Sequence, residues 1–300
     1  MAFTPPADCG PKFPPQHQPQ QPGKEYLMNP LPQPINPNYK PSAKLLGKVA
    51  LVTGGDSGIG RSVCIHFAME GATVGFTFVK GVEDTDKNET IKLIKKFKSP
   101  SSKDPIAIAA DFSRGCESEC QRIVNEFVRH YKTIDVLVND AAVQYYTNSI
   151  DELTEDRVER TFRINIFAYI YMARISLKHM KQGSSIVNLT SVLAYAGSSE
   201  LVDYSATKGA ILTFTRSLAL KVVGQGIRVN GVAPGPIWTP LQVASLPAER
   251  VATLGCEVPM QRAGQPFEVA PAVVFLASNE CSSYFTGQVL HPNGGMIVNA

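Results

Sequence analysis

From residue 47 onward, short apolar runs alternate with longer stretches of helical character. Such nearly continuous apolar runs are typical of parallel strands that are buried on both faces of a sheet. We expect strands at residues 48–53, 73–79, 106–110, 134–138, 185–189, 227–232 and 288–291. We expect helices at residues 60–70, 84–98, 116–131, 155–180 and 268–278, and another that carries Tyr204 and Lys208 and ends near residue 223. The alternation predicts one α/β domain, with a parallel seven-stranded sheet and helices on both faces.

A glycine-rich loop joins the first expected strand to the first expected helix, with the sequence Thr53-Gly54-Gly55-Asp56-Ser57-Gly58-Ile59-Gly60. Glycines let the backbone turn tightly and approach a pyrophosphate, whose negative charge the helix N-terminus stabilises. Such loops are common, but this one lies between a buried strand and a helix, which is the context that dinucleotide binding requires. We therefore predict a single doubly wound domain of the Rossmann type.

Tyr204 and Lys208 are four residues apart on an expected helix, so their side chains lie on one face. A phenol has a reference pKa of about 10 and exchanges protons poorly near neutral pH. A neighbouring ammonium favours the phenolate and lowers that pKa. The pair is thus suited to exchange a proton with a carbonyl or an alcohol.

The loop spacing Thr-Gly-x-x-x-Gly-x-Gly resembles that of the short-chain dehydrogenase/reductase family, and the resemblance extends over residues 46–295. It implies an NAD(P)-dependent enzyme that transfers hydride between nicotinamide and a carbonyl or alcohol. Residues at the family's catalytic positions are Asn165, Ser191, Tyr204 and Lys208. The resemblance makes Tyr204 the proton donor and Ser191 the hydrogen-bond donor to the substrate oxygen. It makes Lys208 the residue that tunes Tyr204 and binds the nicotinamide ribose, while Asn165 holds a water chain.

The resemblance also implies which residues contact the dinucleotide. Asp111, after the third expected strand, matches the position that contacts adenine, and residues 234–239 match the segment that holds the nicotinamide. The predicted set is Gly54, Ser57, Gly58, Ile59, Gly60, Lys80, Asp111, Asn139, Tyr204, Lys208, Pro234, Gly235, Ile237 and Thr239.

The choice between NADP and NAD depends on the end of the second expected strand. NAD enzymes usually have an acid there that binds the ribose 2′-hydroxyl. This strand ends Thr77-Phe78-Val79-Lys80, without an acid. Lys80, Arg61 and Ser57 are candidates to face a 2′-phosphate. We therefore predict NADP(H) as the cofactor and keep NAD, with Lys80 as a solvated charge, as the alternative.

Residues 24–44, the glycine loop and the ending His291-Pro292-Asn293-Gly294-Gly295 resemble a plant and microbial branch of the family. That branch is known for glucose/ribitol dehydrogenase-like and NADPH-dependent aldehyde reductase-like proteins. Asp140 stands where the family has asparagine, and Val143 stands where the sugar-related branch tends to have glutamate. A buried carboxylate at residue 140 must find partners or stay protonated.

Apolar and aromatic residues are expected around the substrate, namely Val143, Val192, Leu193, Tyr195, Trp238 and Leu241. Hydroxyl-rich sugars need paired polar groups, whereas this wall suits a bulky, largely apolar ketone or aldehyde. We therefore predict a carbonyl reductase of specialised metabolism. A sugar or polyol dehydrogenase of the glucose/ribitol type and a non-catalytic NADP(H)-sensing protein remain alternatives.

The first 45 residues differ in composition from the rest. Twelve of the 22 prolines lie between Pro5 and Pro41, interleaved with glutamines. Proline lacks the amide donor and fixes φ, so this segment is unsuited to a helix or a central strand. We expect a disordered Pro/Gln-rich tail at residues 1–25, an extended arm at residues 26–45 and the Rossmann-type domain at residues 46–300.

The remaining composition, with 44% hydrophobic and 18% charged residues, is that of an ordinary soluble globular protein. A net charge of +3 is too small to favour nucleic acid, and no apolar run approaches the roughly 20 residues that span a bilayer. The six scattered cysteines predict no metal site and suggest free thiols in a reducing, cytoplasmic setting. The family resemblance and an apolar C-terminal end favour a homo-oligomer, tetrameric or dimeric, that acts on a small molecule.

Overall fold

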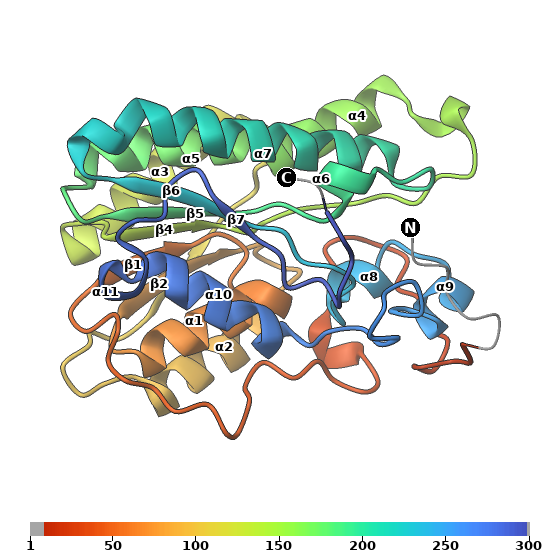
Figure 1. Cartoon of the computed structure of the whole chain (residues 1–300), viewed down its shortest axis with the longest axis horizontal. Coiled ribbons are helices and arrows are strands. Elements are labelled where there is room, and N and C mark those ends of the chain that lie inside the picture. Colours follow the sequence, from red (N-terminus) through yellow and green to blue (C-terminus); the bar gives the residue numbers. More distant parts are fainter. Residues whose placement is uncertain (1–8, 299–300) are drawn as a thin grey trace.

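The computed structural model describes residues 9–298 of the chain. Its centre is a seven-stranded sheet in the order β3-β2-β1-β4-β5-β6-β7, in which every neighbouring pair is parallel (Figure 1). The strands are β1 (Val49–Val52), β2 (Thr73–Phe78), β3 (Ile106–Ala109), β4 (Val136–Asn139), β5 (Ser185–Leu189), β6 (Arg228–Val232) and β7 (Val289–Leu290). The predicted doubly wound α/β fold is confirmed.

Helices cover both faces of this sheet. The helices α1 (Gly58–Met69), α2 (Asp84–Phe97) and α10 (Pro266–Ala277) lie on one face, and α3 (Cys116–Tyr131), α5 (Ala168–Ser176) and α7 (Val202–Val222) lie on the other (Figure 1). Successive side chains of a strand point to opposite faces. Val52 therefore packs into the core beneath α1 and α10, whereas Leu51 packs into the core beneath α3 and α5. No helix among residues 9–298 is both long enough and apolar enough to cross a membrane.

The helix expected at residues 155–180 is interrupted. It consists of α4 (Glu155–Phe162), a π-helical segment η3 (Arg163–Phe167), α5 and the 3₁₀ turn η4 (Leu177–His179). π-helical turns inside α-helices frequently occur at functional sites, and Asn165 lies in this one. Apolar periodicity did not reveal the interruption, because one extra residue in a turn shifts the pattern only locally.

The strand order determines where a ligand can bind. The sheet winds outward in both directions from β1 and β4, and ligands of such folds bind beyond the carboxyl ends of the strands at this switch point. Short helices gather at that end of the sheet, among them α6, α8 and α9 (Figure 1). The short elements are η1 (Glu25–Leu27), η2 (Ile150–Glu152), α6 (Leu193–Ala196), η5 (Val223–Gln225), α8 (Pro240–Val243), α9 (Ala248–Ala252) and α11 (Asn279–Ser282).

The N-terminal segment differs from the expected disordered tail. Residues 1–8 lie outside the described part of the chain, but residues 9–25 pack against the domain near α8 and α9 (Figure 1). The Phe13 ring stacks on Trp238 with 3.7 Å between the ring centres. The prediction of disorder for residues 9–25 is wrong, because individual side chains and amides find partners even though prolines prevent regular structure. Farther along the chain, Met28 and Leu45 of the extended arm are buried in the hydrophobic core.

The cysteines are not all free thiols. Cys9 and Cys256 form a disulfide, which corrects the prediction for these two. The free cysteines are Cys64, Cys116, Cys120 and Cys281, of which only Cys281 is exposed. A separation of 247 residues in sequence gave no signal for the pairing.

Candidate active site

Ser191, Tyr204 and Lys208 line one cavity of about 250 Å³ beyond the carboxyl ends of β5 and β6. Ser191 follows β5, and Tyr204 and Lys208 lie on the first two turns of α7. Their exposed fractions are 8%, 7% and 2%, so their polar atoms interact in a largely water-free environment. Electrostatic effects are stronger there than in water.

Lys208 is held by backbone groups at the end of β5. Its ammonium donates a hydrogen bond to the Leu189 carbonyl oxygen at 2.8 Å. The Thr190 hydroxyl donates to the Lys208 carbonyl oxygen at 2.7 Å. The ammonium lies 5.3 Å from the centre of the Tyr204 ring. These contacts tie α7 to β5, so the spacing between Tyr204 and Lys208 is fixed by the fold.

Asn165 lies behind this cavity and does not line it. Its Nδ2 donates to the Val143 carbonyl oxygen at 2.8 Å and to the Thr207 hydroxyl at 3.1 Å. Its Oδ1 accepts a hydrogen bond from the Val143 amide at 2.9 Å. Both amide hydrogens are thus used within the protein, and one acceptor position of Oδ1 is left for a water.

The electrostatics of Tyr204 differ from the expectation. Burial raises the pKa of Tyr204, a hydrogen bond from Ser191 lowers it, and the negative charge of Asp140 raises it further. The expected lowering by Lys208 does not outweigh burial, since the ammonium is directed to the Leu189 carbonyl. Tyr204 is therefore protonated at neutral pH, which is the form that can donate a proton.

Asp140 lies where this cavity meets a second one and lines both. Burial raises the pKa of Asp140 to about 7, whereas the positive charge of Lys208 lowers it. Burial lowers the pKa of Lys208 to about 8, and the charge of Asp140 opposes that change. The departure from the family's asparagine therefore introduces a carboxyl that titrates beside Lys208.

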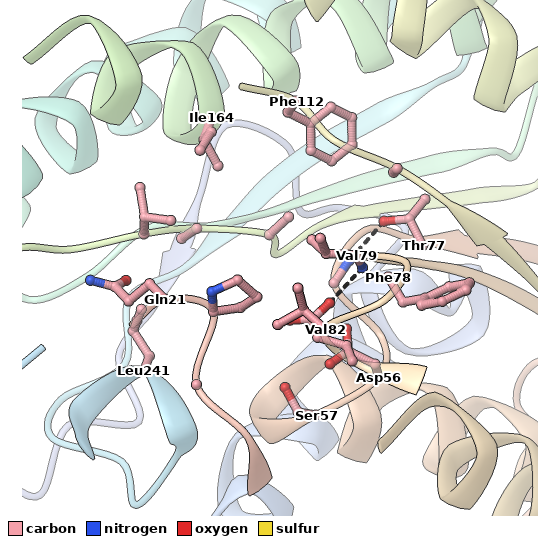
Figure 2. Close-up of a pocket in the computed structure, with 18 of the residues that line it drawn as sticks. Gln21, Asp56, Ser57, Thr77, Phe78, Val79, Val82, Phe112, Ile164 and Leu241 are labelled. Carbon is pink, nitrogen blue, oxygen red and sulfur yellow. Dashed lines mark hydrogen bonds between the residues drawn. The ribbon is translucent and has the colours of Figure 1, made fainter. Parts of the chain in front are cut away.

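The second cavity, of about 390 Å³, is called the cleft, and the first is called the smaller cavity. The cleft runs along the carboxyl ends of β1, β2 and β3. Figure 2 shows Asp56 and Ser57 on one side of it and Phe112 and Ile164 on the other. The predicted dinucleotide contacts that line it are Gly54, Ser57, Gly58, Ile59, Asp111 and Thr239. A Cβ at Gly60 would lie 2.1 Å from the Gly54 carbonyl oxygen, so the loop closes only with glycine there. This glycine cradle at the N-terminus of α1 fits a pyrophosphate.

The other predicted dinucleotide contacts lie elsewhere. Pro234, Gly235 and Ile237 line the smaller cavity. Thr239 lines both the smaller cavity and the cleft. Asn139 is fully buried, and its Nδ2 donates to Asn188 Oδ1 at 2.9 Å. Asn139 therefore joins β4 to β5 and supports the edge of the site.

Of the three residues predicted as candidates to face a 2′-phosphate, two do not line the cleft. Lys80 is exposed and does not line the cleft. Arg61 is buried, and its guanidinium forms ion pairs with Glu25 and with Asp86, the latter at 3.0 Å. These partners lie far from Arg61 in sequence, so the sequence did not reveal that its charge is already used. Ser57 does line the cleft.

Acidic and basic residues that were not predicted also line the cleft, namely Asp56, Glu83, Arg114 and Arg160. Burial raises the pKa of Asp56 to about 6 and raises that of Glu83 well above its ordinary value. Glu83 accepts a hydrogen bond from the Val79 amide at 2.6 Å. The nearby charge of Asp56 is one of the causes that raise the pKa of Glu83.

The smaller cavity contains only part of the predicted apolar wall. Val192, Leu193 and Leu241 line it, but Tyr195 and Trp238 do not, and Val143 lines the cleft instead. The sequence could not give these side-chain directions, because they depend on packing by distant segments. Polar residues that line the cavity and were not predicted include Gln144, Ser198, Glu200, Gln242, Arg250 and Glu257.

Tyr195 and Trp238 have other neighbours. Trp238 is fully buried, and its indole N–H donates to the Pro30 carbonyl oxygen at 2.9 Å. Tyr195 packs edge-on against His291, with 5.1 Å between the ring centres. Both aromatic rings stabilise the surrounding loops and do not face the cavity.

Comparison with known proteins agrees with this geometry. The profile of the Enoyl-(Acyl carrier protein) reductase family matches residues 54–297. The chain is 62% identical over 290 residues to "Glucose and ribitol dehydrogenase" of Daucus carota, with 97% of this chain and 99% of that protein covered. It is 60% identical over 285 residues to "NADPH-dependent aldehyde reductase 1, chloroplastic" of Arabidopsis thaliana, with 95% and 98% covered.

A solved structure with the same fold is a short-chain dehydrogenase from Burkholderia cenocepacia J2315 in complex with NADP. The TM-score is 0.75 and the identity 28%, over 84% of this chain and 99% of that one. The chain belongs to the short-chain dehydrogenase/reductase family. It is an NAD(P)-dependent oxidoreductase that acts on CH–OH or C=O groups, as the sequence predicted.

Proposed function

We propose that this protein uses NADPH to reduce the carbonyl group of a small molecule and catalyses the reverse oxidation with NADP. The observation that carries the proposal is the convergence of Ser191, Tyr204 and Lys208 on a cavity that meets the glycine-lined cleft. When bound, the nicotinamide supplies the hydride. Tyr204 donates its proton to the carbonyl oxygen as that oxygen gains negative charge.

The other three residues support this proton transfer. The Ser191 hydroxyl donates a hydrogen bond to the same oxygen and stabilises its developing charge. Lys208 provides a positive charge next to Tyr204 once the phenol has lost its proton. Asn165 keeps the Val143 backbone and the Thr207 hydroxyl in place behind the site.

NADP(H) is the proposed dinucleotide, and NAD is the alternative. One relative is named an NADPH-dependent reductase, and a solved neighbour holds NADP. No acid directly follows β2, and Arg114 lines the cleft. The raised pKa values of Asp56 and Glu83 favour the neutral forms of these carboxyls, which lessens the negative charge that a 2′-phosphate would meet. Comparison of kcat/KM for NADPH and NADH tests this choice, and an equal or higher value for NADH would contradict it.

The proposed substrate is an aldehyde or ketone of modest size that carries a hydrogen-bonding substituent. Pockets for drug-sized ligands usually have volumes of roughly 300–1,000 Å³, and this cavity is smaller. Val192, Leu193 and Leu246 are among its apolar residues, and Gln144 and Glu200 are among its polar ones. This mixture supports the proposal better than the bulky, largely apolar carbonyl of specialised metabolism that the sequence suggested.

The second candidate is a sugar or polyol dehydrogenase. Arg250 and Glu200 form an ion pair at 2.9 Å beside the cavity, which gives paired polar groups that hydroxyls require. A panel of short aldehydes, aryl and terpenoid ketones, glucose and ribitol separates the candidates. Highest kcat/KM for short polar aldehydes supports the first proposal, whereas highest values for glucose or ribitol support the second. Highest kcat/KM for terpenoid ketones would instead support the bulky, largely apolar carbonyl substrate that the sequence suggested.

Cytoplasmic location and homo-oligomeric assembly stay predictions. Leu220 near the end of α7 and Val223 at the start of η5 have exposed fractions of 81% and 50%, which is compatible with an interface between copies. The disulfide between Cys9 and Cys256 favours a compartment that is less reducing than the cytosol. Light scattering of the purified protein gives its assembly state, and thiol labelling in cell extracts gives the state of the two cysteines.

A further inference from the structure

The N-terminal segment contributes residues to the dinucleotide cleft. Gln21, Pro22 and Gly23 line it, opposite residues of the glycine loop and beside Leu241. Figure 2 shows the ribbon that carries Gln21 passing between Leu241 and the side of the cleft formed by Ser57. The family profile begins at residue 54, so this wall of the cleft lies outside the segment that the profile matches.

One end of this segment is fixed to the first turn of α1. The Gly58 amide donates a hydrogen bond to the Glu25 carboxyl at 2.6 Å, and Arg61 forms an ion pair with the same carboxyl. The Glu25 amide donates to Asp86 Oδ2 at 2.8 Å. Arg61 offsets part of the charge of Glu25, and burial raises the pKa of Glu25 to about 7, so this carboxyl can lie near the helix N-terminus without repelling an incoming phosphate strongly.

The other end is fixed to residues 238–256, which follow β6. Phe13 stacks on Trp238, and the Lys12 amide donates to the Ala252 carbonyl oxygen at 2.7 Å. Farther toward the N-terminus, the disulfide joins Cys9 to Cys256. The segment therefore bridges the nucleotide loop and the loop region beside the substrate cavity.

Gln21 connects the segment to the smaller cavity as well. Its Oε1 accepts a hydrogen bond from the Gln144 amide at 3.0 Å, and its Nε2 donates to the Gln144 carbonyl oxygen. The Gln144 side chain in turn donates to Ser245 Oγ at 2.7 Å. A displacement of Gln21 would thus be felt in both cavities.

We propose that residues 9–25 form a clamp that closes over the bound dinucleotide and slows its release. Residues 21–23 form the part of the clamp that faces the dinucleotide. Glu25 holds one end, and Phe13 with the Cys9–Cys256 disulfide holds the other. The proposal rests on the proposed function, in which a nicotinamide dinucleotide occupies the cleft. It applies equally to NADPH and to NADH.

Two glycines of the clamp provide a matched pair of variants. A Cβ at Gly23 would lie 2.4 Å from the Pro240 carbonyl oxygen and 2.8 Å from the Ala244 Cβ, so Gly23→Ala must lift the clamp from α8. A Cβ at Gly10 meets nothing within 4 Å, so Gly10→Ala leaves the contacts intact. Both substitutions add one methyl group to the same segment, and only one of them displaces it.

The experiment follows the fluorescence of bound NADPH after rapid mixing with an excess of non-fluorescent NADP. A separate experiment does the same with bound NADH and an excess of NAD. We expect Gly23→Ala to release the dinucleotide about tenfold faster than the wild type, because changes at one interface act mostly on dissociation. Gly10→Ala should release it at the wild-type rate. Thermal unfolding of both variants verifies that the domain remains folded.

A second measurement uses the unaltered protein. Dithiothreitol transfers two electrons to the disulfide and becomes oxidised, leaving thiols at Cys9 and Cys256. Release should then be about threefold faster, as one anchor of the clamp is lost. Cys281→Ser, which alters an exposed free cysteine, should show the same response. Hydrogen exchange of residues 12–23 should slow when NADPH is added.

Equal release rates for Gly23→Ala and Gly10→Ala, with both folded, would overturn the clamp. Unchanged hydrogen exchange at residues 12–23 on NADPH addition would overturn it as well. Tighter binding of NADH than of NADPH would contradict the proposed choice of cofactor but not the clamp. In that case, faster release of NADH from Gly23→Ala than from the wild type would still support the clamp.

Discussion

Asp140 and Lys208 line the same cavity, where burial shifts their pKa values toward each other. The pKa of Asp140 is raised to about 7 and that of Lys208 is lowered to about 8. Each charge partly offsets the desolvation of the other. Both residues line the cavity that contains Tyr204, so the protonation of the pair affects the proton donor.

Asp140→Asn should move the alkaline limb of the kcat/KM profile to lower pH by roughly one unit. The carboxylate of Asp140 raises the pKa of Lys208 and that of Tyr204, so its removal lowers both. Activity that needs charged Lys208 and protonated Tyr204 is then lost at lower pH. The other titrating groups that face Asp140 are Asp56 and Cys64, from the glycine loop and α1, and Tyr169 on α5.

The measurement is the pH dependence of NADPH oxidation with a reactive aldehyde, between about pH 5 and 10, a range that includes the pKa values of Asp140 and Lys208. Asp151→Asn, at an exposed position, is the control for loss of a carboxylate and should leave the profile unchanged. An alkaline limb that stays in place in Asp140→Asn would show that this carboxyl does not influence the reacting groups.

Tyr204→Phe should lower kcat by about 10²- to 10⁴-fold, the usual contribution of a positioned proton donor. The ring remains, so its packing is retained and NADPH binding should change less than threefold. Stopped-flow turnover and fluorescence titration of NADPH measure the two quantities. Near-normal turnover would mean that another group donates the proton.

The strands, the glycine loop and the Tyr204–Lys208 pair could be predicted because each depends on local patterns, whereas Ser191 was implied by the family resemblance. Buried strands are apolar whatever surrounds them, and the loop and the helix pair have fixed spacings. Trp238 was misplaced because the direction of its ring depends on Phe13 and Pro30, more than 200 positions away in sequence. Arg61 was misassigned for the same reason, since Glu25 and Asp86 already surround its guanidinium.

The N-terminal segment shows a further limit of sequence patterns. Proline-rich composition correctly excludes helices and strands there, apart from the short turn η1. It does not exclude a fixed irregular path, which arises from single contacts such as that of Gln21 with Gln144. Such contacts have no periodicity, so composition alone suggested disorder.

Arg250→Gln should raise KM for polar substrates about tenfold while kcat changes little, the expected result of losing a contact that binds ground and transition states equally. Arg250 lines the substrate cavity and pairs with Glu200 at 2.9 Å. Arg174→Gln is a matched control, because Arg174 is about as exposed as Arg250 and pairs with Glu117, which does not line the cavity. An unchanged KM in Arg250→Gln would place the substrate elsewhere in the cavity.

Phe13→Ala should red-shift the fluorescence of Trp238 and lower the free energy of unfolding by about 1–3 kcal/mol, through loss of aromatic packing. Trp238 is the only tryptophan in the chain, so its emission reports directly on the docking of the N-terminal segment. The ring is fully buried and stacks on Phe13, and loss of that ring admits water to the indole. Urea unfolding followed by this emission measures both effects.

Tyr284→Ala provides the control, because Tyr284 is fully exposed and its loss removes an aromatic ring without opening a buried contact. Its emission maximum and unfolding midpoint should match those of the wild type. Should Phe13→Ala also match the wild type in both, the N-terminal segment would not be docked on Trp238 in solution. Agreement between the Phe13→Ala red shift and a red shift in Gly23→Ala would show that both ends of the segment dock together.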